Sequence, residues 1–517
     1  MIEKKIINLF YITGFTILIM GCSKDSKGES ITEEPILINY FIDNDKDGYG
    51  NPDKTFSLLA ESKPNGYIDN NLDCDDTNKN INPLVDDYAY DGLDFNCDGK
   101  AESIITAFSK TYGGSDLESA RSVVQAKNGN YLIVGYTASA DGDVSINKGD
   151  RDVWIIKLDN NGNLLWEKTY GGSDIDEAHF IIQNKLGDFL ILGTTGSRDF
   201  NVSNNNGLLD YWILKIDIDG NILWQETFGG SMSEYPQGIV ESTDGHFALI
   251  GFSESPDGDV AGNKGDSDIW FARINANGTL VTSVTYGGSG YDRSDGIIED
   301  QDGNYIISGT TYSKDGDLTG INDGIGMNWI LKIDKEGAIL TNTVYGGNRD
   351  DQGTEIINTS DGGYLLGGHS FSDNNGLTNN GSGDVWVMKF SIDNQISWQM
   401  NFGGSRNDYV RRLLELEDGY MVLCDVFSGD GQIERNYGTG DLEPILLKLD
   451  KNGNIKWQKN YGGSSSDSGA DIINGLDGGY LMVGSTGSNN YDILLNKGKT
   501  DAWLLKLDPE FNMNPNR

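Results

Sequence analysis

The sequence predicts an all-β fold: a seven-bladed β-propeller closed by an N-terminal strand, with a small Asp-rich calcium-binding module before it. An aromatic residue, two glycines and Ser or Asn form a phrase that occurs seven times, at intervals of 57 to 59 residues. No window of the second repeat, residues 173–230, shows the 3.6-residue apolar rhythm of a helix. A period this regular indicates one supersecondary unit copied seven times. The first glycines of the seven copies are Gly113, Gly171, Gly229, Gly287, Gly346, Gly403 and Gly462.

The second full unit, residues 173–230, shows what one repeat contains. Two short apolar runs flank Leu186-Gly187-Asp188 and predict a tight hairpin. A polar stretch rich in Asn, Gly and Ser follows and predicts a loop. The third run is apolar on both faces apart from one basic residue, which is typical of a strand between neighbouring blades. Four antiparallel strands in a repeat of this length indicate a propeller blade. The predicted strands are residues 178–182, 189–193, 210–216 and 221–228.

The two ends of the repeat region predict how the ring closes. The chain ends shortly after a third strand, residues 501–507, so the last blade lacks its fourth. A spare fourth strand precedes the first blade at residues 105–112, where Phe108 lies five residues before the first glycine of its phrase. We therefore expect the N-terminal strand to complete the C-terminal blade, which leaves no open edge in the ring.

The repeated motifs resemble those of a bacterial propeller family. Gly-Gly-Ser-x-x-Asp, Asp-Gly-x-Tyr-x-x-Gly and Asp-x-Trp-x-x-Lys-Leu-Asp are similar to SBBP-like β-propeller repeats over residues 103–508. This resemblance implies the fold and almost nothing about activity. Residues 157–166 also resemble the docking motif of quinoprotein-like propellers. Those enzymes carry an adjacent Cys pair and eight blades, and the chain has neither, so quinone chemistry is not expected.

The N-terminus predicts the location. Lys4 and Lys5 precede an apolar run, residues 6–21, that is short for a membrane span. The run ends at a segment that resembles a lipobox, which implies a signal peptide at residues 1–21, a lipid on Cys22 and a tether at residues 22–35. Ser23 rather than Asp resembles outer-membrane sorting, with the protein surface-exposed or facing the periplasm. An ordinary signal peptide with an incidental Cys is the alternative.

The charge balance limits the class of partner. Lys and Arg number 39 against 79 Asp and Glu, which gives a net charge of −40. This charge argues against nucleic acid and against anionic membrane as electrostatic partners. We therefore expect the protein to associate with the membrane through the lipid on Cys22. We also expect the chain to be a monomer.

Residues 36–102 differ from the repeats and are rich in clustered Asp. Alternating carboxylates that precede a turn at Gly48 can wrap a hard cation. All-oxygen ligation favours Ca²⁺ over copper, since residues 31–100 contain no His, Trp or Met. The predicted calcium ligands are Asp43, Asp45, Asp47, Asp73, Asp75, Asp91, Asp94 and Asp98. The alternative is an acidic linker made of Asx turns.

The Asp clusters, with Asn82-Pro83 between the last two, resemble a known metal-binding module. It is the MopE-type module of a copper-repressible surface protein of methanotrophs, and thrombospondin type 3 calcium loops are similar. The sequence departs from it at Tyr90, where many members have Cys. Cys74 and Cys97 remain as the pair, and their natural interpretation is one disulfide in an oxidising compartment.

Every repeat carries an acid three residues after its Ser or Asn, and this acid has two interpretations. The functional one is a carboxylate ring near the axis that binds a cation or a cationic ligand. The structural one pairs each acid with the basic residue of a third strand, and we favour it because a role present in every blade is usually architectural. The acids are Glu118, Asp176, Glu234, Asp292, Asp351, Asp408 and Asp467; the basic residues are Lys157, Lys215, Arg273, Lys332, Lys389, Lys448 and Lys506.

No nucleophile motif, catalytic carboxylate pair or phosphate loop stands out, and the three histidines occupy unmatched positions. We therefore expect a surface-anchored binding module for a glycan or a protein. The alternative is a glycoside hydrolase, whose two carboxylates would come from different blades. The sixth unit is the most irregular, with Arg411-Arg412, a long loop at residues 428–441, and Glu443-Pro444 at the start of its third strand. We expect the ligand on the face with the long second-to-third loops.

Overall fold

The structure is a computed structural model, and it describes residues 37–53, 55, 57–79, 81–83, 97, 107–260, 262–322, 325–434 and 442–512. The chain divides into two compact units, residues 1–102 and 103–517. No helix within the described ranges is long and apolar enough to cross a membrane. The predicted signal peptide, Cys22 and the tether lie outside the described residues.

Unit 1 contains a small antiparallel sheet in the order β2-β1-β3. Tyr40 of the central strand and Ile81 are its buried apolar side chains within the described residues. Such a small core indicates that other interactions must hold this unit together. The strands are β1 (Ile38–Ile42), β2 (Ser57–Ala60) and β3 (Tyr67–Ile68).

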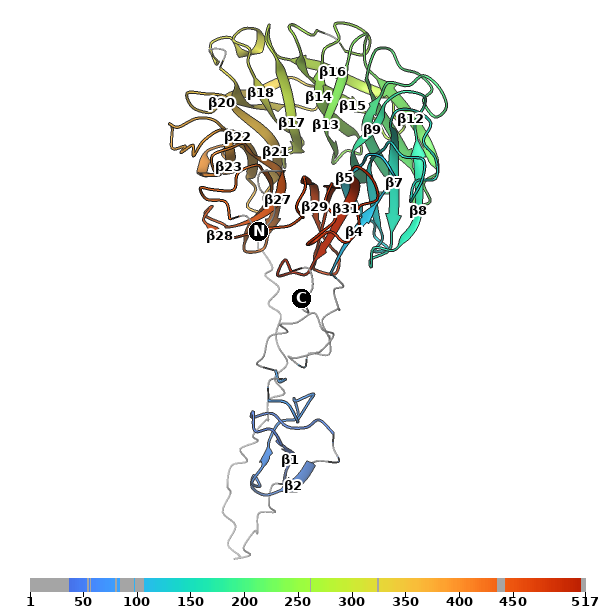
Figure 1. Ribbon diagram of the computed structural model, residues 1–517. Helices are drawn as coiled ribbons and strands as arrows, with labels where there is room; N and C mark the ends of the chain where they lie inside the picture. Colours follow the sequence, from blue (N-terminus) through green and yellow to red (C-terminus); the bar gives the residue numbers. More distant parts are fainter. Residues whose placement is uncertain are drawn as a thin grey trace, which may run out of the picture. The chain divides into compact units, whose positions relative to one another are not determined.

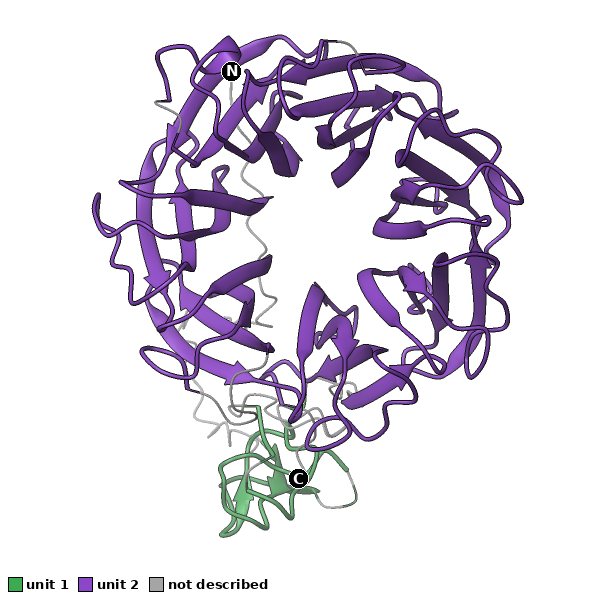
Figure 2. Cartoon of the chain, turned by 45° about the horizontal axis from the view of Figure 1, so that its top comes forward, with its two compact units in different colours: residues 1–102 green, residues 103–517 purple. Residues whose placement is uncertain are grey.

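Unit 2 consists of seven four-stranded antiparallel sheets arranged around a centre, as Figure 2 shows in purple. The all-β prediction of four-stranded blades is confirmed. From the innermost strand outward, the first four sheets are β5 (Glu118–Gln125), β6 (Tyr131–Thr137), β7 (Asp152–Leu158), β8 (Leu164–Tyr170); β9 (Asp176–Gln183), β10 (Phe189–Thr195), β11 (Asp210–Ile216), β12 (Ile222–Phe228); β13 (Glu234–Glu241), β14 (Phe247–Ser253), β15 (Asp268–Ile274), β16 (Leu280–Tyr286); and β17 (Asp292–Glu299), β18 (Tyr305–Thr311), β19 (Met327–Ile333), β20 (Ile339–Tyr345).

The last three sheets follow the same order. They are β21 (Asp351–Asn358), β22 (Tyr364–Ser370), β23 (Asp384–Phe390), β24 (Ile396–Phe402); β25 (Asp408–Leu416), β26 (Gly419–Val426), β27 (Glu443–Asp450), β28 (Ile455–Asn460); and β29 (Asp467–Asn474), β30 (Tyr480–Thr486), β31 (Asp501–Leu507), β4 (Phe108–Tyr112). A single turn of 3₁₀ helix, η2 (Gly316–Leu318), lies in the second-to-third loop of the fourth sheet. We number the blades one to seven in this order.

The third strands are buried on both faces, as their apolar sequences predict. All seven residues of β7 are buried, and the same holds for β11, β15, β23 and β31. Six of the seven third strands carry a buried Trp whose indole N–H donates to the adjacent fourth strand. That of Trp154, for example, donates to Glu167 at 2.9 Å. Burying a large aromatic ring with its one polar atom satisfied stabilises the packing between blades.

The N-terminal strand completes the seventh blade, as the sequence predicts. β4 is paired antiparallel with β31, and Phe108 faces Lys506 while Thr111 faces Trp503. The indole N–H of Trp503 donates to the Ser109 hydroxyl at 2.9 Å, across the two ends of the chain. β29, β30 and β31 in turn contact β5 of the first blade. Figure 1 shows β4 beside β31.

Candidate functional site

The seven acids of the repeat are buried and bound by the protein's own donors. Asp176 is fully buried and accepts hydrogen bonds from the Gly172 amide at 2.7 Å, the Ser197 hydroxyl at 2.8 Å and the Thr195 hydroxyl. Burial raises the pKa of Asp176, and these three donors act in the opposite direction. The second Gly of the motif donates to the acid in the same way in every blade. The acids therefore hold the junctions between blades, which supports the structural interpretation.

The predicted pairing of these acids with the basic residues of the third strands is wrong. Strand register explains why: Glu118 faces Thr137, which faces Asp152, whereas Lys157 lies at the other end of β7, opposite Leu132. Six of the basic residues instead pair with an acid in the first-to-second turn of their own blade, and Lys157, whose blade has Asn there, donates to the Ile218 carbonyl. The pairs are Lys215–Asp188, Arg273–Asp244, Lys332–Asp300, Lys389–Asp361, Lys448–Asp418 and Lys506–Asp477.

A second set of buried carboxylates lies beside the first. At the start of β7, Asp152 accepts from a backbone amide with one oxygen, and its Oδ1 has no hydrogen-bond partner. A Cβ at Gly171 would stand 2.6 Å from that oxygen and 2.7 Å from Oδ2 of Asp176, so only glycine fits between the two carboxylates. Blade four has Met327 at this position. The same unpartnered Oδ1 occurs in Asp210, Asp268, Asp384 and Asp501.

These crowded carboxylates are costly to ionise. Burial raises the pKa of Asp152 to about 6 and that of Asp268 to about 7, and the neighbouring acids Asp176 and Asp292 add to each shift. Since both groups lie inside the junction, the protonated form is the one that folding favours.

A β-bulge interrupts every inner strand at one equivalent position. The register between the first and second strands shifts once per blade, and the extra residue lies three positions after the repeat acid. A bulge re-aims a side chain away from the regular alternation of the strand. The residues differ from blade to blade: Arg121, His179, Gln237, Asp295, Thr354, Arg411 and Ala470.

All seven bulge residues line one central cavity of about 400 Å³. Tyr136 and Ser485 also line it, and they lie at the ends of β6 and β30 that lead into the long second-to-third loops. The cavity therefore lies in the half of the ring nearer the face that carries these loops. Its volume falls within the range of small-molecule pockets, about 300–1,000 Å³.

Arg412, the residue after a bulge, connects the inner strands across the centre. Its Nη1 lies 3.1 Å from Glu355 of blade five, and its Nε lies 3.1 Å from Asp471 of blade seven. Its guanidinium carbon also stands 5.5 Å from the ring centroid of Phe180, in blade two. Asp471 accepts further hydrogen bonds from Ser122, so the network reaches blade one. Burial raises the pKa of Glu355 to about 7.

Sequence reasoning found only part of this site. It singled out Arg411 and Arg412 as an irregularity, and both line the cavity. It gave His179 no functional role, although this histidine occupies a bulge. A usable signal was present: the position three residues after the repeat acid varies in type while its surroundings repeat.

Unit 1 brings together four of the predicted calcium ligands. Carboxylate oxygens of Asp43, Asp45 and Asp47 lie within 4.8 Å of one another, and those of Asp45, Asp73 and Asp76 do likewise. One oxygen each of Asp45, Asp47 and Asp73 is buried without a hydrogen-bond partner among the described residues. Burial raises the pKa of Asp73 to about 6, and the charges of Asp47, Asp45 and Asp76 add to it. Converging, unsatisfied carboxylates of this kind fit a hard cation such as Ca²⁺.

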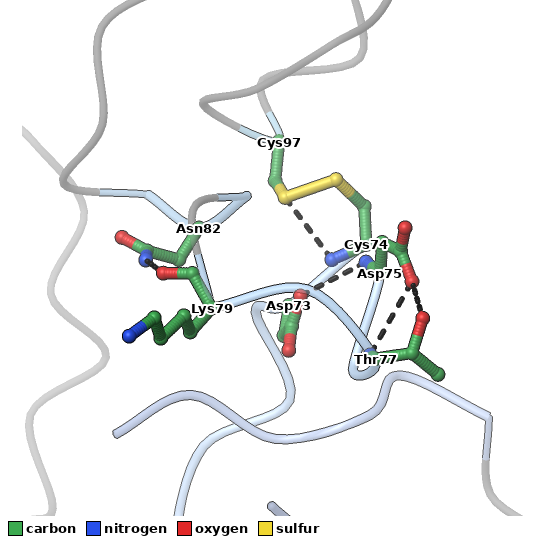
Figure 3. The surroundings of a disulfide bond; sticks show 7 residues. All are labelled: Asp73, Cys74, Asp75, Thr77, Lys79, Asn82 and Cys97. Atoms are coloured by element: carbon green, nitrogen blue, oxygen red, sulfur yellow. Dashed lines mark hydrogen bonds between the residues drawn. A yellow bond between two sulfur atoms is a disulfide. The ribbon is translucent and has the colours of Figure 1, made fainter. Parts of the chain in front are cut away.

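Of the other four predicted calcium ligands, the structure describes one and leaves three outside the described residues. Asp75 belongs to neither group, and its side chain accepts from the Thr77 amide and hydroxyl, as Figure 3 shows. Its neighbour Asp76, which was not predicted, takes part instead. Asp91, Asp94 and Asp98 lie outside the described residues. The disulfide between Cys74 and Cys97 is confirmed, and it holds the segment that carries Asp73.

Comparison with known proteins gives distant likenesses. No protein family profile matches the chain. The regulatory protein FlaEY of Caulobacter vibrioides is 22% identical over 389 residues, which cover 62% of this chain and 40% of FlaEY. The chain thus spans about two fifths of that relative.

Among solved structures, Plexin A from Drosophila, in complex with Semaphorin 1b, is 7% identical over 78% of this chain and 88% of its own, with a TM-score of 0.44. Hydrazine synthase from Kuenenia stuttgartiensis is 11% identical over 72% and 94%, with a TM-score of 0.42. Likenesses at this level carry no argument about function.

The buried carboxylate of Asp268 predicts a pH-dependent stability. Its folded pKa of about 7 exceeds the ordinary value of 3.8, so its contribution favours folding below pH 4 and is lost as the pH rises through about 7. Asp268→Asn should raise the free energy of unfolding at pH 8 by about 1–2 kcal/mol, because an amide there can donate toward Asp292. At pH 5 the gain should shrink. Denaturant unfolding at the two pH values measures it.

The matched control is Asp266→Asn, two residues earlier and exposed, which should change stability little at either pH. An equal gain for Asp268→Asn at both pH values, or a loss at pH 8, would contradict the assignment.

Proposed function

We propose that this protein is a monomeric, lipid-anchored binding module of the outer membrane, stabilised by calcium, whose ligand enters the central cavity. The ligand is a glycan or a segment of protein. The observation that carries this proposal is the set of seven bulge residues around one cavity. The framework of each blade repeats, whereas the seven side chains at the centre include cationic, anionic, neutral polar and apolar types. A rigid repeat that presents a varied set of groups is suited to recognition.

Glycoside hydrolysis is less well supported. It requires two carboxylates about 5–10 Å apart with space for the sugar between them. Among the residues that line the cavity the one carboxylate is Asp295, and Arg293 pairs with it at 3.4 Å. Glu355 has a raised pKa, but its oxygens are held by Arg412 and by the Leu413 amide. No observation therefore favours hydrolysis over binding.

Filling the cavity should abolish binding. Ala470→Trp places a large ring at the bulge of blade seven, and ligands found by screening the full chain on glycan and extracellular-protein arrays should lose at least about tenfold in affinity. Asn128→Trp, on an exposed turn of blade one, is the control and should bind normally. Binding that survives Ala470→Trp, with unchanged thermal unfolding, would place the ligand elsewhere.

Arg412 is unsuitable for such a test. Its removal leaves Glu355 and Asp471 buried without their cation, and loss of one partner from a buried pair costs about 3–5 kcal/mol. A loss of binding in that variant would therefore not separate recognition from folding. Arg411, whose side chain is 45% exposed, is the better choice.

Calcium should bind unit 1 and order it. We expect a dissociation constant on the order of 10⁻⁴–10⁻³ M, as in extracellular modules. Asp73→Asn should weaken binding at least about tenfold, because it removes a converging, unpartnered oxygen. Asp75→Asn is the matched control two residues away, and it should bind nearly as the parent does. Calorimetry with Ca²⁺ on the full chain measures both, and equal losses in the two variants would contradict the ligand set.

Lipid on Cys22 should hold the protein in the membrane fraction. Cys22→Ser should remove incorporation of labelled fatty acid and release the chain into the soluble fraction, because no other anchor is proposed. Cys424→Ser is the control, since this buried thiol lies far along the chain from the lipobox. Retention of the label in Cys22→Ser would show that the anchor assignment is wrong.

A further inference from the structure

The central cavity concentrates arginine in a strongly acidic protein. The chain has a net charge of −40 and contains 11 arginines, and four of them line the cavity: Arg121, Arg293, Arg411 and Arg412. They come from blades one, four and six, so the ring gathers them from distant parts of the sequence. Whether they attract an anion depends on how far each charge is already matched.

Asp425 binds the Nε of Arg411 and leaves the two terminal nitrogens of the guanidinium available to a ligand. Its Nε donates to Asp425 at 2.8 Å, and that carboxylate is fully buried and also accepts from Ser468 and Gly469. No hydrogen bond within the described residues engages Nη1 or Nη2 of Arg411, and its side chain is 45% exposed. A carboxylate behind an arginine fixes the direction of the guanidinium without covering its outer edge.

Arg121 has no carboxylate partner in the part of the chain that the structure describes. It is exposed, and its guanidinium carbon lies 5.5 Å from the ring centroid of Tyr136. Arg151 also stacks on this ring, at 4.9 Å, but its charge is matched by Glu177. An aromatic face orients a guanidinium and leaves its N–H groups free in the ring plane.

The other ionisable groups of the cavity do not offset Arg121. Arg293 and Asp295 pair with each other, and Arg412 lies between Glu355 and Asp471. Burial, together with the charge of Arg121, lowers the pKa of His179 to about 4, so this histidine is neutral at pH 7. The unmatched charge that faces the cavity is therefore the positive charge of Arg121, and the free edge of Arg411 lines the same cavity.

We propose that the cavity recognises an oxyanion, a carboxylate or a sulfate carried by the ligand, through Arg121 and Arg411. Planar guanidinium groups bind such anions with paired hydrogen bonds. Tyr136 and Phe180 provide apolar surface for the part of the ligand that carries the anion. This inference rests on the proposed function in that it requires the ligand to enter the cavity, and it narrows the ligand to acidic molecules.

The test uses the full chain and three probes by titration calorimetry at low ionic strength: inorganic sulfate, galacturonate and galactose. Sulfate and galacturonate should bind and compete with each other, whereas galactose, which lacks only the anionic group of galacturonate, should bind at least about tenfold more weakly. Arg121→Gln and Arg411→Gln should each weaken galacturonate about tenfold or more. Arg198→Gln, on an exposed loop outside the cavity, is the control and should change nothing. Thermal unfolding confirms that each variant is folded.

The outcomes separate this inference from the proposed function. If galactose binds as well as galacturonate and both arginine variants bind normally, while Ala470→Trp abolishes binding, the anion assignment is wrong and the cavity remains the binding site. If neither anion binds, the assignment is likewise overturned, and ligands from the arrays still test the cavity. If the anions bind and Ala470→Trp leaves their affinity unchanged, the proposed cavity itself is wrong. If sulfate binds and galacturonate does not, the cavity still recognises an oxyanion, and the recognised group is a sulfate rather than a carboxylate.

Discussion

The buried acid at the start of each inner strand is the interaction on which the ring depends. It joins the two glycines between blades to the end of the second strand, through the Gly amide and the hydroxyls of Thr or Ser. The same side chain thus fixes the Gly-Gly segment between two blades and the start of the long second-to-third loop. Because a carboxylate buried without donors would be unstable, each acid needs the Gly amide and donors near the end of the second strand. In blade six, where Val426 ends that strand, these donors are the Phe427 amide and the amide and hydroxyl of Ser428. This explains why the phrase is repeated so strictly.

The inner strands combine this constraint with one position that is free of it. Three residues after the acid, the bulge removes a side chain from the ladder and aims it at the centre. Residue types as different as Arg, His, Thr and Ala occur at the same position, so the blade does not require one kind of side chain there. Arg412, the residue after the bulge of blade six, lines the cavity and also joins blades five, six and seven.

Features that repeat along the chain could be predicted from the sequence, and features that depend on register could not. The period of about 58 residues gives the blades, and the missing and spare strands give the pairing of the N-terminal strand with the third strand of the last blade. The basic residue of each third strand was assigned the wrong acid, because periodicity shows which residues recur but not which end of a strand each occupies. The position of each bulge, and the presence of Asp76 rather than Asp75 in the Asp cluster, depend on shifts of a single residue. Composition and spacing do not reveal such shifts. The candidate site was therefore visible only as an irregular sixth unit.

The pairing of β4 with β31 also has a mechanical consequence. Everything that precedes unit 2 joins it through β4, so any tension between the N-terminal part of the chain and the ring is first transmitted to this five-residue strand. Detaching β4 would leave the edge of β31 unpaired, while β29, β30 and β31 would still contact β5 of the first blade. A pull from the N-terminal side would thus act on the last blade before the first, although β4 precedes the first blade in the sequence.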